Sequence, residues 1–270
     1  MTDNLNAPPT FPLSDAALFF DVDGTLVAIE RQPDAVKVSD HLRDLLQRLA
    51  TGTNGAFALV SGRSIDQLDH LFAPLAFSAS GLHGLEKRLL PGEITRAGPM
   101  QQGMTKQGIE GARRELERFA DRHEGVFVED KGLTLALHYR MAAEHREAAA
   151  ALVRKLVEAD PDHLVLLEGK MVFELKPPGF DKGRAIADFM QQPPFRGRQP
   201  IFAGDDVTDE AGFAVINALK GVTVKVGADD RPTEASFGLS GVEATLEWLD
   251  ALADSETSAD GKIGGSGGGS

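Results

Sequence analysis

The chain has 270 residues, of which 42% are hydrophobic, enough for one large domain or two smaller ones with packed cores. Its 41 acidic residues outnumber its 28 basic ones and give a net charge of -13, which argues against nucleic acid or an anionic membrane as a partner. The absence of cysteine excludes disulfides, zinc–thiolate sites and enzymes with a cysteine nucleophile. A monomer is the default expectation.

The two ends of the chain differ in composition from the rest. The start, MTDNLNAPPTFPL, has neither a basic segment nor an apolar core, and no stretch is long enough to span a bilayer, so we expect a cytoplasmic protein. We expect residues 1–14 to be a flexible tail. We also expect residues 253–270 to be a disordered tail, because the chain ends in GGSGGGS, which is typical of an engineered flexible linker.

Residues 15–90 alternate short apolar runs with amphipathic helices. An apolar run at 17–20 is followed by a helix with leucines on one face, a second apolar run at 56–60 and a helix after Ser64. This alternation predicts a doubly wound α/β fold. The leucines are Leu42, Leu45, Leu46 and Leu49.

The pattern changes at residue 91 and returns at residue 176. Helices are expected at 105–123 and 142–159, and pairs of strands that turn at 130–132 and 168–170. From residue 176 to residue 252 the α/β alternation resumes. We therefore predict a discontinuous α/β core, 15–90 and 176–252, interrupted by an α+β cap domain, 91–175.

Two aspartates follow the first apolar run. Asp21 and Asp23 are two residues apart on an extended segment, so both can face one reacting centre at the carboxyl edge of the sheet, where ligands of α/β proteins bind. The alternative is that Asp23 and Gly24 only form a turn.

Three further strings occur in a fixed order along the chain: VSGR at 60–63, DKG at 181–183 and GDDVTDE at 204–210. Each has an ordinary structural explanation: Ser61 can end a strand, Ser64 can cap a helix, Lys182 can be solvated, and Asp209 can complement a helix N-terminus. Together they supply a hydroxyl, an amine and a second strand that ends in paired acids. This combination favours phosphate chemistry.

The four strings resemble the four motifs of the haloacid dehalogenase superfamily. The strings GLHGLE (81–86), EDKG (129–132), LHYR (137–140), FELKPPGFDKG (173–183) and GDDVTDEAGF (204–213) are similar to trehalose-phosphate phosphatases, and the similarity extends from about residue 17 to residue 249. The resemblance implies a Rossmann-like core with a cap. It also implies hydrolysis of trehalose 6-phosphate with Mg²⁺ through an aspartyl-phosphate intermediate.

The resemblance also implies roles for individual residues. Asp21 is the nucleophile, Asp23 the general acid and base, and Ser61 and Lys182 hold the phosphoryl group. Asp21, the carbonyl of Asp23, and Asp205 bind Mg²⁺, with Asp206 and Asp209 acting through water or behind the ligands. The expected phosphate and substrate contacts from the core are Gly24, Thr25, Gly62 and Arg63, although Arg63 can also brace the core against the cap.

The cap is expected to choose the substrate. By resemblance, Glu129, Lys131 and Glu174 bind the sugar, whereas Glu168 and Lys170 are equally well explained as solvated turn residues, and His83 receives no chemical role. Two alternatives stay open: an enzyme of this class acting on another sugar phosphate, phosphomutases included, and a non-catalytic sugar-phosphate-binding protein. The intact pair of Asp21 and Asp23 argues against a mere binding protein.

Overall fold

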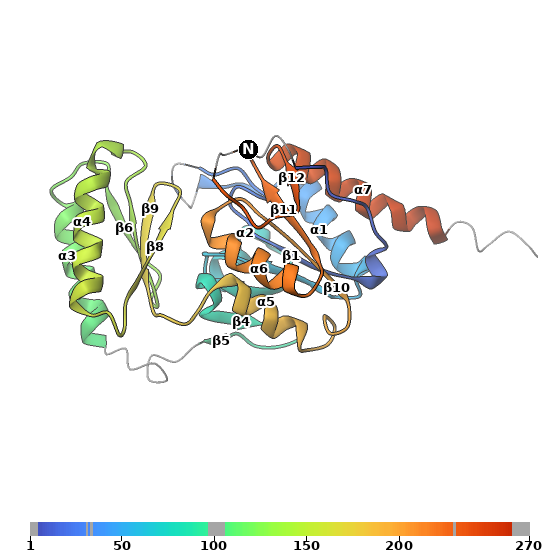
Figure 1. Ribbon diagram of the computed structural model, residues 1–270, viewed down its shortest axis with the longest axis horizontal. Helices are drawn as coiled ribbons and strands as arrows, with labels where there is room; N and C mark the ends of the chain where they lie inside the picture. Colours follow the sequence, from blue (N-terminus) through green and yellow to red (C-terminus); the bar gives the residue numbers. More distant parts are fainter. Residues whose placement is uncertain (1–4, 31, 33–34, 97–105, 229–230, 261–270) are drawn as a thin grey trace, which may run out of the picture.

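The chain forms two β-sheets, each covered by helices, in a computed structural model that describes residues 5–30, 32, 35–96, 106–228 and 231–260 (Figure 1). The large sheet has eight strands and the small sheet has four. The strands of the small sheet lie between β5 and β10 in the chain, so they form an insert between two segments of the large sheet. The predicted α/β fold is confirmed, and the order of the elements along the chain matches a core with an inserted cap.

The large sheet has the order β12-β11-β10-β1-β2-β3-β4-β5. Its first six strands in this order are parallel, whereas β4 and β5 are antiparallel. The central β1 is buried along its whole length, as expected for a parallel strand covered on both faces. The strands are β1 (Ala16–Phe20), β2 (Phe57–Val60), β3 (Ser78–Gly81), β4 (Glu86–Arg88), β5 (Thr95–Arg96), β10 (Gln199–Gly204), β11 (Val222–Val226) and β12 (Phe237–Leu239).

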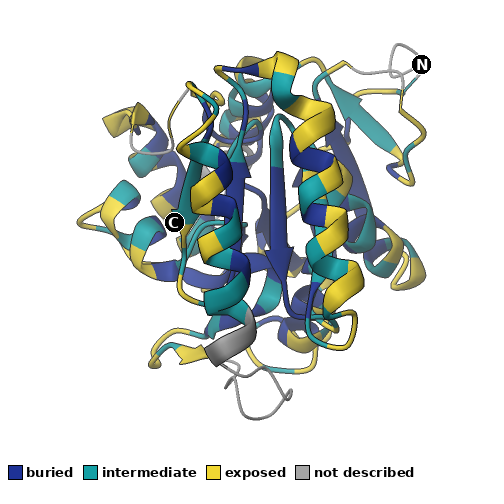
Figure 2. Cartoon of the chain, turned by 90° about the vertical axis from the view of Figure 1, so that its left-hand side faces the viewer, coloured by how far each residue is buried: buried dark blue, intermediate teal, exposed yellow. Residues whose placement is uncertain are grey.

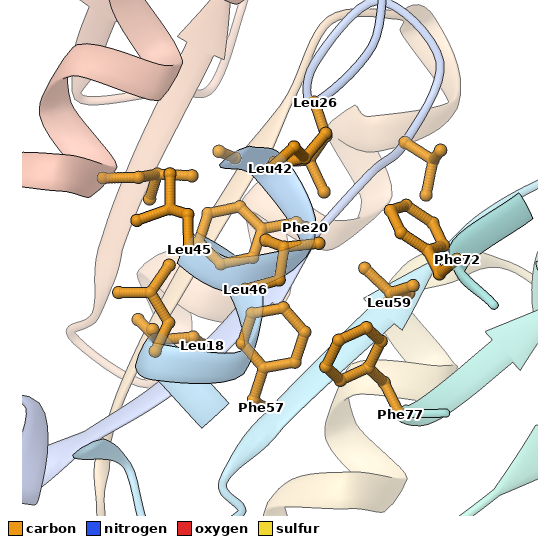
Figure 3. Packing of buried hydrophobic residues seen from close by; sticks show 14 of the residues in the cluster. Leu18, Phe20, Leu26, Leu42, Leu45, Leu46, Phe57, Leu59, Phe72 and Phe77 are labelled. Carbon is orange, nitrogen blue, oxygen red and sulfur yellow. The ribbon is translucent and has the colours of Figure 1, made fainter. Parts of the chain in front are cut away.

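Helices cover both faces of this sheet because alternate residues of β1 point in opposite directions. Leu18 and Phe20 pack with the first set of helices: α1 (Asp40–Gly52), α2 (Ile65–Phe72) and α7 (Val242–Asp260). Ala17 and Phe19 pack with the second set: α5 (Lys182–Met190) and α6 (Glu210–Ala218). Figure 3 shows the leucines of α1 lying over the phenylalanines of β1 and β2.

The cap is an antiparallel sheet of order β6-β7-β9-β8 with two helices against it. Figure 2 shows exposed residues on the outer sides of these helices and buried residues between them and the sheet. The elements are α3 (Lys106–Ala120), β6 (Phe127–Asp130), β7 (Leu135–His138), α4 (Arg146–Ala159), β8 (Val165–Gly169) and β9 (Val172–Lys176). Short 3-10 helices complete the chain: η2 (Leu13–Asp15), η4 (Leu82–Gly84), η6 (Ala143–His145) and η7 (Val207–Asp209).

The predicted tails, residues 1–14 and 253–270, were both too long. The described residues from 5 to 14 lie along the core, where Leu13 is buried and Trp248 Nε1 donates to Pro9 O at 3.2 Å. At the other end α7 continues to Asp260, because Leu252 and Ala253 pack in the core and no glycine or proline follows before residue 261. Residues 1–4 and the glycine-rich segment after residue 260 lie outside the described residues.

The predicted start of the cap, residue 91, was also too early. β5 pairs with β4 in the large sheet, so the chain stays with the core as far as Arg96. Among the described residues, no helix combines the length and apolar character needed to cross a membrane.

Candidate active site

Three neighbouring parallel strands end at one edge of the large sheet. β1 lies between β10 and β2, and Asp21, Ser61 and Asp205 each directly follow the end of one of these strands. Because parallel strands present their carboxyl ends at the same edge, these three side chains meet there. All three are at least 95% buried, with exposed fractions of 5%, 1% and 2% respectively.

A buried lysine joins the acids at this edge. Lys182 is the first residue of α5, and its Nζ lies 2.9 Å from Asp21 Oδ1 and 2.6 Å from Asp209 Oδ1. Burial lowers the pKa of Lys182, but the charges of Asp209 and Asp21 outweigh it, so the net pKa is raised and the ammonium is cationic. The sequence alone allowed a solvated lysine at this position, and the structure rules that out.

The acids form a cluster suited to a cation. Oxygen atoms of Asp21, Asp205 and Asp209 lie within 4.8 Å of one another. Among the described residues Asp205 Oδ1 is buried without a hydrogen-bond partner, and two lysines, Lys182 and Lys170, face the three carboxylates, so one negative charge is left uncompensated. Three carboxylates with an unused oxygen fit a hard divalent cation, which prefers oxygen ligands. Asp209, expected behind the direct ligands, contributes the third carboxylate of the cluster.

Gly24 lets the loop that follows β1 approach the acid cluster. It has φ of +88°, and a Cβ atom there would overlap the carboxylate of Asp205. Thr25 is fully buried next to it, and its hydroxyl has no partner among the described residues. The motif DGT therefore has a steric requirement for glycine at its second position.

Asp23 does not join the acid cluster through its side chain. Arg63 Nε and Nη2 donate to its two carboxylate oxygens, both at 2.7 Å, in a bidentate contact. The guanidinium therefore holds an acid, where the sequence suggested a phosphate or a brace against the cap. Arg63 N also donates to Ser61 Oγ at 3.2 Å, so a single residue fixes both Asp23 and the serine hydroxyl.

The cap closes over these groups and forms a shared pocket. The pocket is partly open to solvent. Core and cap both line it, and the predicted residues along its wall are Asp21, Asp23, Ser61, Gly62, Arg63, Glu129, Lys131, Glu174, Lys182, Asp205 and Asp206.

Glu129 of β6 is tied to both domains. His138 of β7 contacts its Oε2 at 3.0 Å, and Gln67 of the core helix α2 donates to its Oε1 at 2.9 Å. Burial would raise the pKa of Glu129, but the hydrogen bond of His138, the charge of Lys131 and the Gln67 amide outweigh it and lower the pKa to about 2. The carboxylate is ionised at neutral pH.

Lys131 and Glu174 form a second bridge between cap and core. Lys131 Nζ donates to Gly62 O at 3.0 Å and to Glu174 Oε2 at 3.2 Å. Glu174 also contacts Nε2 of His83 at 3.3 Å, while its Oε1 is buried without a hydrogen bond to the described residues. Burial opposes ionisation of Glu174, but Lys131 and His83 hold its pKa well below the usual range.

The two uncertain turn residues of the cap have different surroundings. Glu168 lies 3.7 Å from Arg146 and from Arg154, away from the pocket. Lys170 reaches the core instead and forms an ion pair with Asp205 Oδ2. Neither observation assigns a sugar contact, but Lys170 places a cap cation directly on the acid cluster.

Gln67 and His138 were not identified as site residues from the sequence. Gln67 Oε1 accepts from Ser64 N, while Gln67 Nε2 donates to Glu129 of the cap. The sequence position of Gln67 is explained by the capping box of α2 alone, so it gave no reason to expect a contact with the cap. His138 lies within the string LHYR, and the strand alternation that places it beside Glu129 depends on the register of β6 and β7. That register was the missing information.

Comparisons with known proteins decide the family. The sequence model described as Trehalose-phosphatase matches residues 19–243. The chain belongs to the trehalose-phosphatase family. This family consists of phosphoric monoester hydrolases, which confirms the predicted enzyme class.

Relatives of this trehalose-phosphatase family member cover most of its length. The trehalose-6-phosphate phosphatase of Escherichia coli K12 is 41% identical over 93% of this chain and 91% of its own length. The probable trehalose-phosphate phosphatase of Sinorhizobium fredii is 39% identical over 89% of each chain. The C-terminal domain of the C. albicans trehalose-6-phosphate phosphatase superposes with a TM-score of 0.77 at 22% identity, over 89% of this chain and 93% of its own, which supports the fold.

Proposed function

We propose that this chain hydrolyses trehalose 6-phosphate to trehalose and inorganic phosphate, with Mg²⁺ as its cofactor. One observation carries the proposal: the buried pair of Asp21 and Lys182 lies in the same pocket as the cap residues Glu129, Lys131 and Glu174. The first pair suits phosphoryl transfer, and the cap residues offer charged hydrogen-bonding groups to a polyhydroxy substrate. Membership of the trehalose-phosphatase family supports the choice of sugar.

In the first step a carboxylate oxygen of Asp21 attacks phosphorus and the bond from phosphorus to the sugar oxygen breaks. Asp23 donates a proton to the departing oxygen, so trehalose leaves as a neutral alcohol. Lys182 lies 2.9 Å from the attacking carboxylate, where it offsets negative charge on both reactants. The product of this step is an aspartyl phosphate on Asp21.

In the second step water attacks phosphorus and regenerates Asp21. Asp23, now deprotonated, removes the proton from this water, and inorganic phosphate leaves. The bidentate contact with Arg63 holds Asp23 as a carboxylate, the form that acts as the base in this step. To act as the acid in the first step, Asp23 carries a proton on one oxygen and retains the contact with Arg63 only through the other. Ser61 and Gly62 line the pocket together with Asp21, which supports a role for the serine hydroxyl and nearby backbone amides in holding phosphate oxygens.

Asp21 and Asp205, with the backbone carbonyl of Asp23, are the proposed Mg²⁺ ligands. Asp209 pairs with Lys182 and receives a hydrogen bond from Asp206 N at 2.9 Å, which positions the cluster. When bound, Mg²⁺ would neutralise the charge that accumulates on the phosphoryl oxygens. Repulsion between a carboxylate and a phosphate is about 4 kcal/mol per pair of unit charges at ~4 Å with an effective dielectric near ~20. Lys182 is shared between Asp21 and Asp209, so a further cation is needed to offset the charges of a phosphate dianion.

The test is phosphate release from a panel of compounds in the presence of Mg²⁺. We expect the kcat/KM for trehalose 6-phosphate to exceed that for glucose 6-phosphate by at least about 10²-fold, because a smaller sugar leaves buried polar groups unpaired. Equal efficiency with glucose 6-phosphate would show that the sugar assignment is wrong, although the chemistry could stand. No phosphate release from any ester would contradict the catalytic assignment itself.

A further inference from the structure

His83 of the string GLHGLE contacts the cap residue Glu174 through its side chain, and the mechanism above does not use it. It lies in η4, is only 8% exposed, and has φ of +55°, in the left-handed region that residues other than glycine seldom adopt, although histidine is enriched there. Its Nε2 lies 3.3 Å from Glu174 Oε2. A strained, buried residue at a domain junction points to a functional requirement for that position.

The backbone of η4 holds the loop that carries Ser61. The amide of His83 donates to Ser61 O at 3.1 Å, and the amide of Leu82 donates to Arg63 O at 2.9 Å. Between these anchors, Gly62 packs directly on the imidazole, since a Cβ there would lie 2.6 Å from His83 Nε2. The backbone amides of Leu82 and His83 therefore hold the loop that carries Ser61, while the imidazole of His83 contacts the cap.

The protonation state of the ring follows from its surroundings. Burial lowers the pKa of His83 more than the charge of Glu174 raises it, so the imidazole is neutral at pH 7. Glu174, as a carboxylate, only accepts hydrogen bonds. The proton must therefore be on Nε2, which leaves Nδ1 as an acceptor, buried and unpartnered among the described residues.

We propose that His83 is a positioning residue that orients Glu174 for the sugar through an Nε2–H donor and links it to the loop at Ser61. Lys131 donates to the same oxygen, Oε2, so two donors fix the orientation of this carboxylate. This inference rests on the proposed function, because it assigns Glu174 to sugar recognition.

A matched pair of variants separates this role from a structural one. In His83→Gln the amide nitrogen can replace Nε2, whereas in His83→Asn the side chain is too short to reach Glu174. Asparagine tolerates a positive φ better than most residues, so a purely structural role predicts that His83→Asn is the milder change. A positioning role predicts the reverse order for trehalose 6-phosphate.

Dissociation constants for trehalose 6-phosphate are measured by calorimetry in an Asp21→Asn background, which prevents hydrolysis. Turnover of trehalose 6-phosphate and of p-nitrophenyl phosphate is measured in His83 variants that retain Asp21. We expect His83→Asn to weaken trehalose 6-phosphate binding by about tenfold or more and His83→Gln by no more than about threefold. Turnover of p-nitrophenyl phosphate should fall clearly less than turnover of trehalose 6-phosphate in His83→Asn, because the backbone amides that hold the Ser61 loop are retained. Equal losses on both substrates, or a milder effect of His83→Asn, would overturn the proposal.

A second measurement uses the wild-type protein, so it does not depend on whether a variant folds. ¹⁵N NMR of the histidine-labelled wild type reports which ring nitrogen of each of the seven histidines carries the proton. We expect a neutral His83 protonated at Nε2, and an Nδ1-protonated or cationic ring at pH 7 would refute the assignment. If the wild type fails to cleave trehalose 6-phosphate although this tautomer is found, the proposed function has failed rather than the contact between His83 and Glu174.

Discussion

Lys170 of the cap forms an ion pair with Asp205, the proposed metal ligand of the core. Its turn is held by Arg140, whose Nη2 donates to Lys170 O at 2.7 Å. Asp205 is anchored from the other side, since Lys225 Nζ donates to its carbonyl at 2.7 Å. The cap therefore brings a cation to the place where the proposed mechanism needs Mg²⁺, and the two cations compete for one carboxylate.

The first prediction follows from this competition. Lys170→Met removes the competing ammonium, so Mg²⁺ should bind about three- to tenfold more tightly, as measured by calorimetry without substrate. Lys155→Met is the matched control, because it removes the same charge from the exposed face of α4. Unchanged affinity in Lys170→Met would show that the ion pair does not oppose metal binding.

The second prediction concerns the nucleophile. Asp21→Asn removes the attacking oxygen anion but keeps the size of the side chain, and Lys182 retains its contact with Asp209. Turnover of every phosphate ester should fall at least about 10³-fold, while the melting temperature and the affinity for trehalose 6-phosphate change little. Phosphate release close to the wild-type rate would eliminate covalent catalysis by Asp21.

The third prediction concerns the metal. Exhaustive chelation should abolish phosphate release, and added Mg²⁺ should restore it. Ca²⁺ should restore it poorly, because it prefers longer bonds and higher coordination than a site of few carboxylates offers. Full activity after chelation, with residual metal measured by mass spectrometry, would argue that the lysines Lys182 and Lys170 suffice to balance the charge of the acid cluster.

The fourth prediction separates cap from core. Lys131→Met loses both the contact with Gly62 and the contact with Glu174, and leaves that carboxylate buried without its lysine. The kcat/KM for trehalose 6-phosphate should fall by about tenfold or more, whereas the kcat/KM for p-nitrophenyl phosphate, which needs only the core, should change little. Loss on both substrates would indicate a folding defect, and loss on neither would remove Lys131 from recognition.

The fifth prediction concerns acid stability. The pKa of Glu129 is about 2 in the folded protein against an ordinary value of 4.5, so its ionised form stabilises the folded state. That contribution is complete above pH 4.5 and is lost as the pH falls through 2. The difference in melting temperature between wild type and Glu129→Gln should therefore be largest above pH 5 and shrink towards pH 2.

The control for this measurement is Glu158→Gln, at an exposed position of α4. A difference between wild type and Glu129→Gln that does not change with pH would show that Glu129 makes no net electrostatic contribution.

The α/β core could be predicted because its strands are buried on both faces and appear as apolar runs, as in β1 and β2. β4 could not be predicted in this way, since its sequence is Glu86, Lys87 and Arg88. Two of these charges are buried by long-range partners: Ile65 N donates to Glu86 at 2.7 Å, and Arg88 pairs with Asp69 at 2.6 Å. A local pattern does not contain such partners.

In the site, too, features that follow from a local pattern were predictable, and features that depend on long-range partners were not. Asp21, Ser61 and Asp205 were predictable because each follows a strand, and strand order then brings them together. The partner of Arg63 was not predictable, since phosphate and Asp23 both suit a guanidinium and only the fold decides between them. The cap contacts of Gln67 and Lys170 depend on how two domains meet, which no periodicity within either domain encodes.

The side-chain amide of Gln67 binds a core residue through its oxygen and a cap residue through its nitrogen, which lowers the entropy lost when the two domains meet. Its Oε1 is bound to Ser64 N within α2, so the side chain is immobilised whether or not the cap is present. Ordering a free glutamine would cost up to about 2 kcal/mol of rotamer entropy. Because α2 has already fixed this conformation, the Nε2 contact with Glu129 forms without that loss, and the core presents a rigid docking point to an otherwise separate domain.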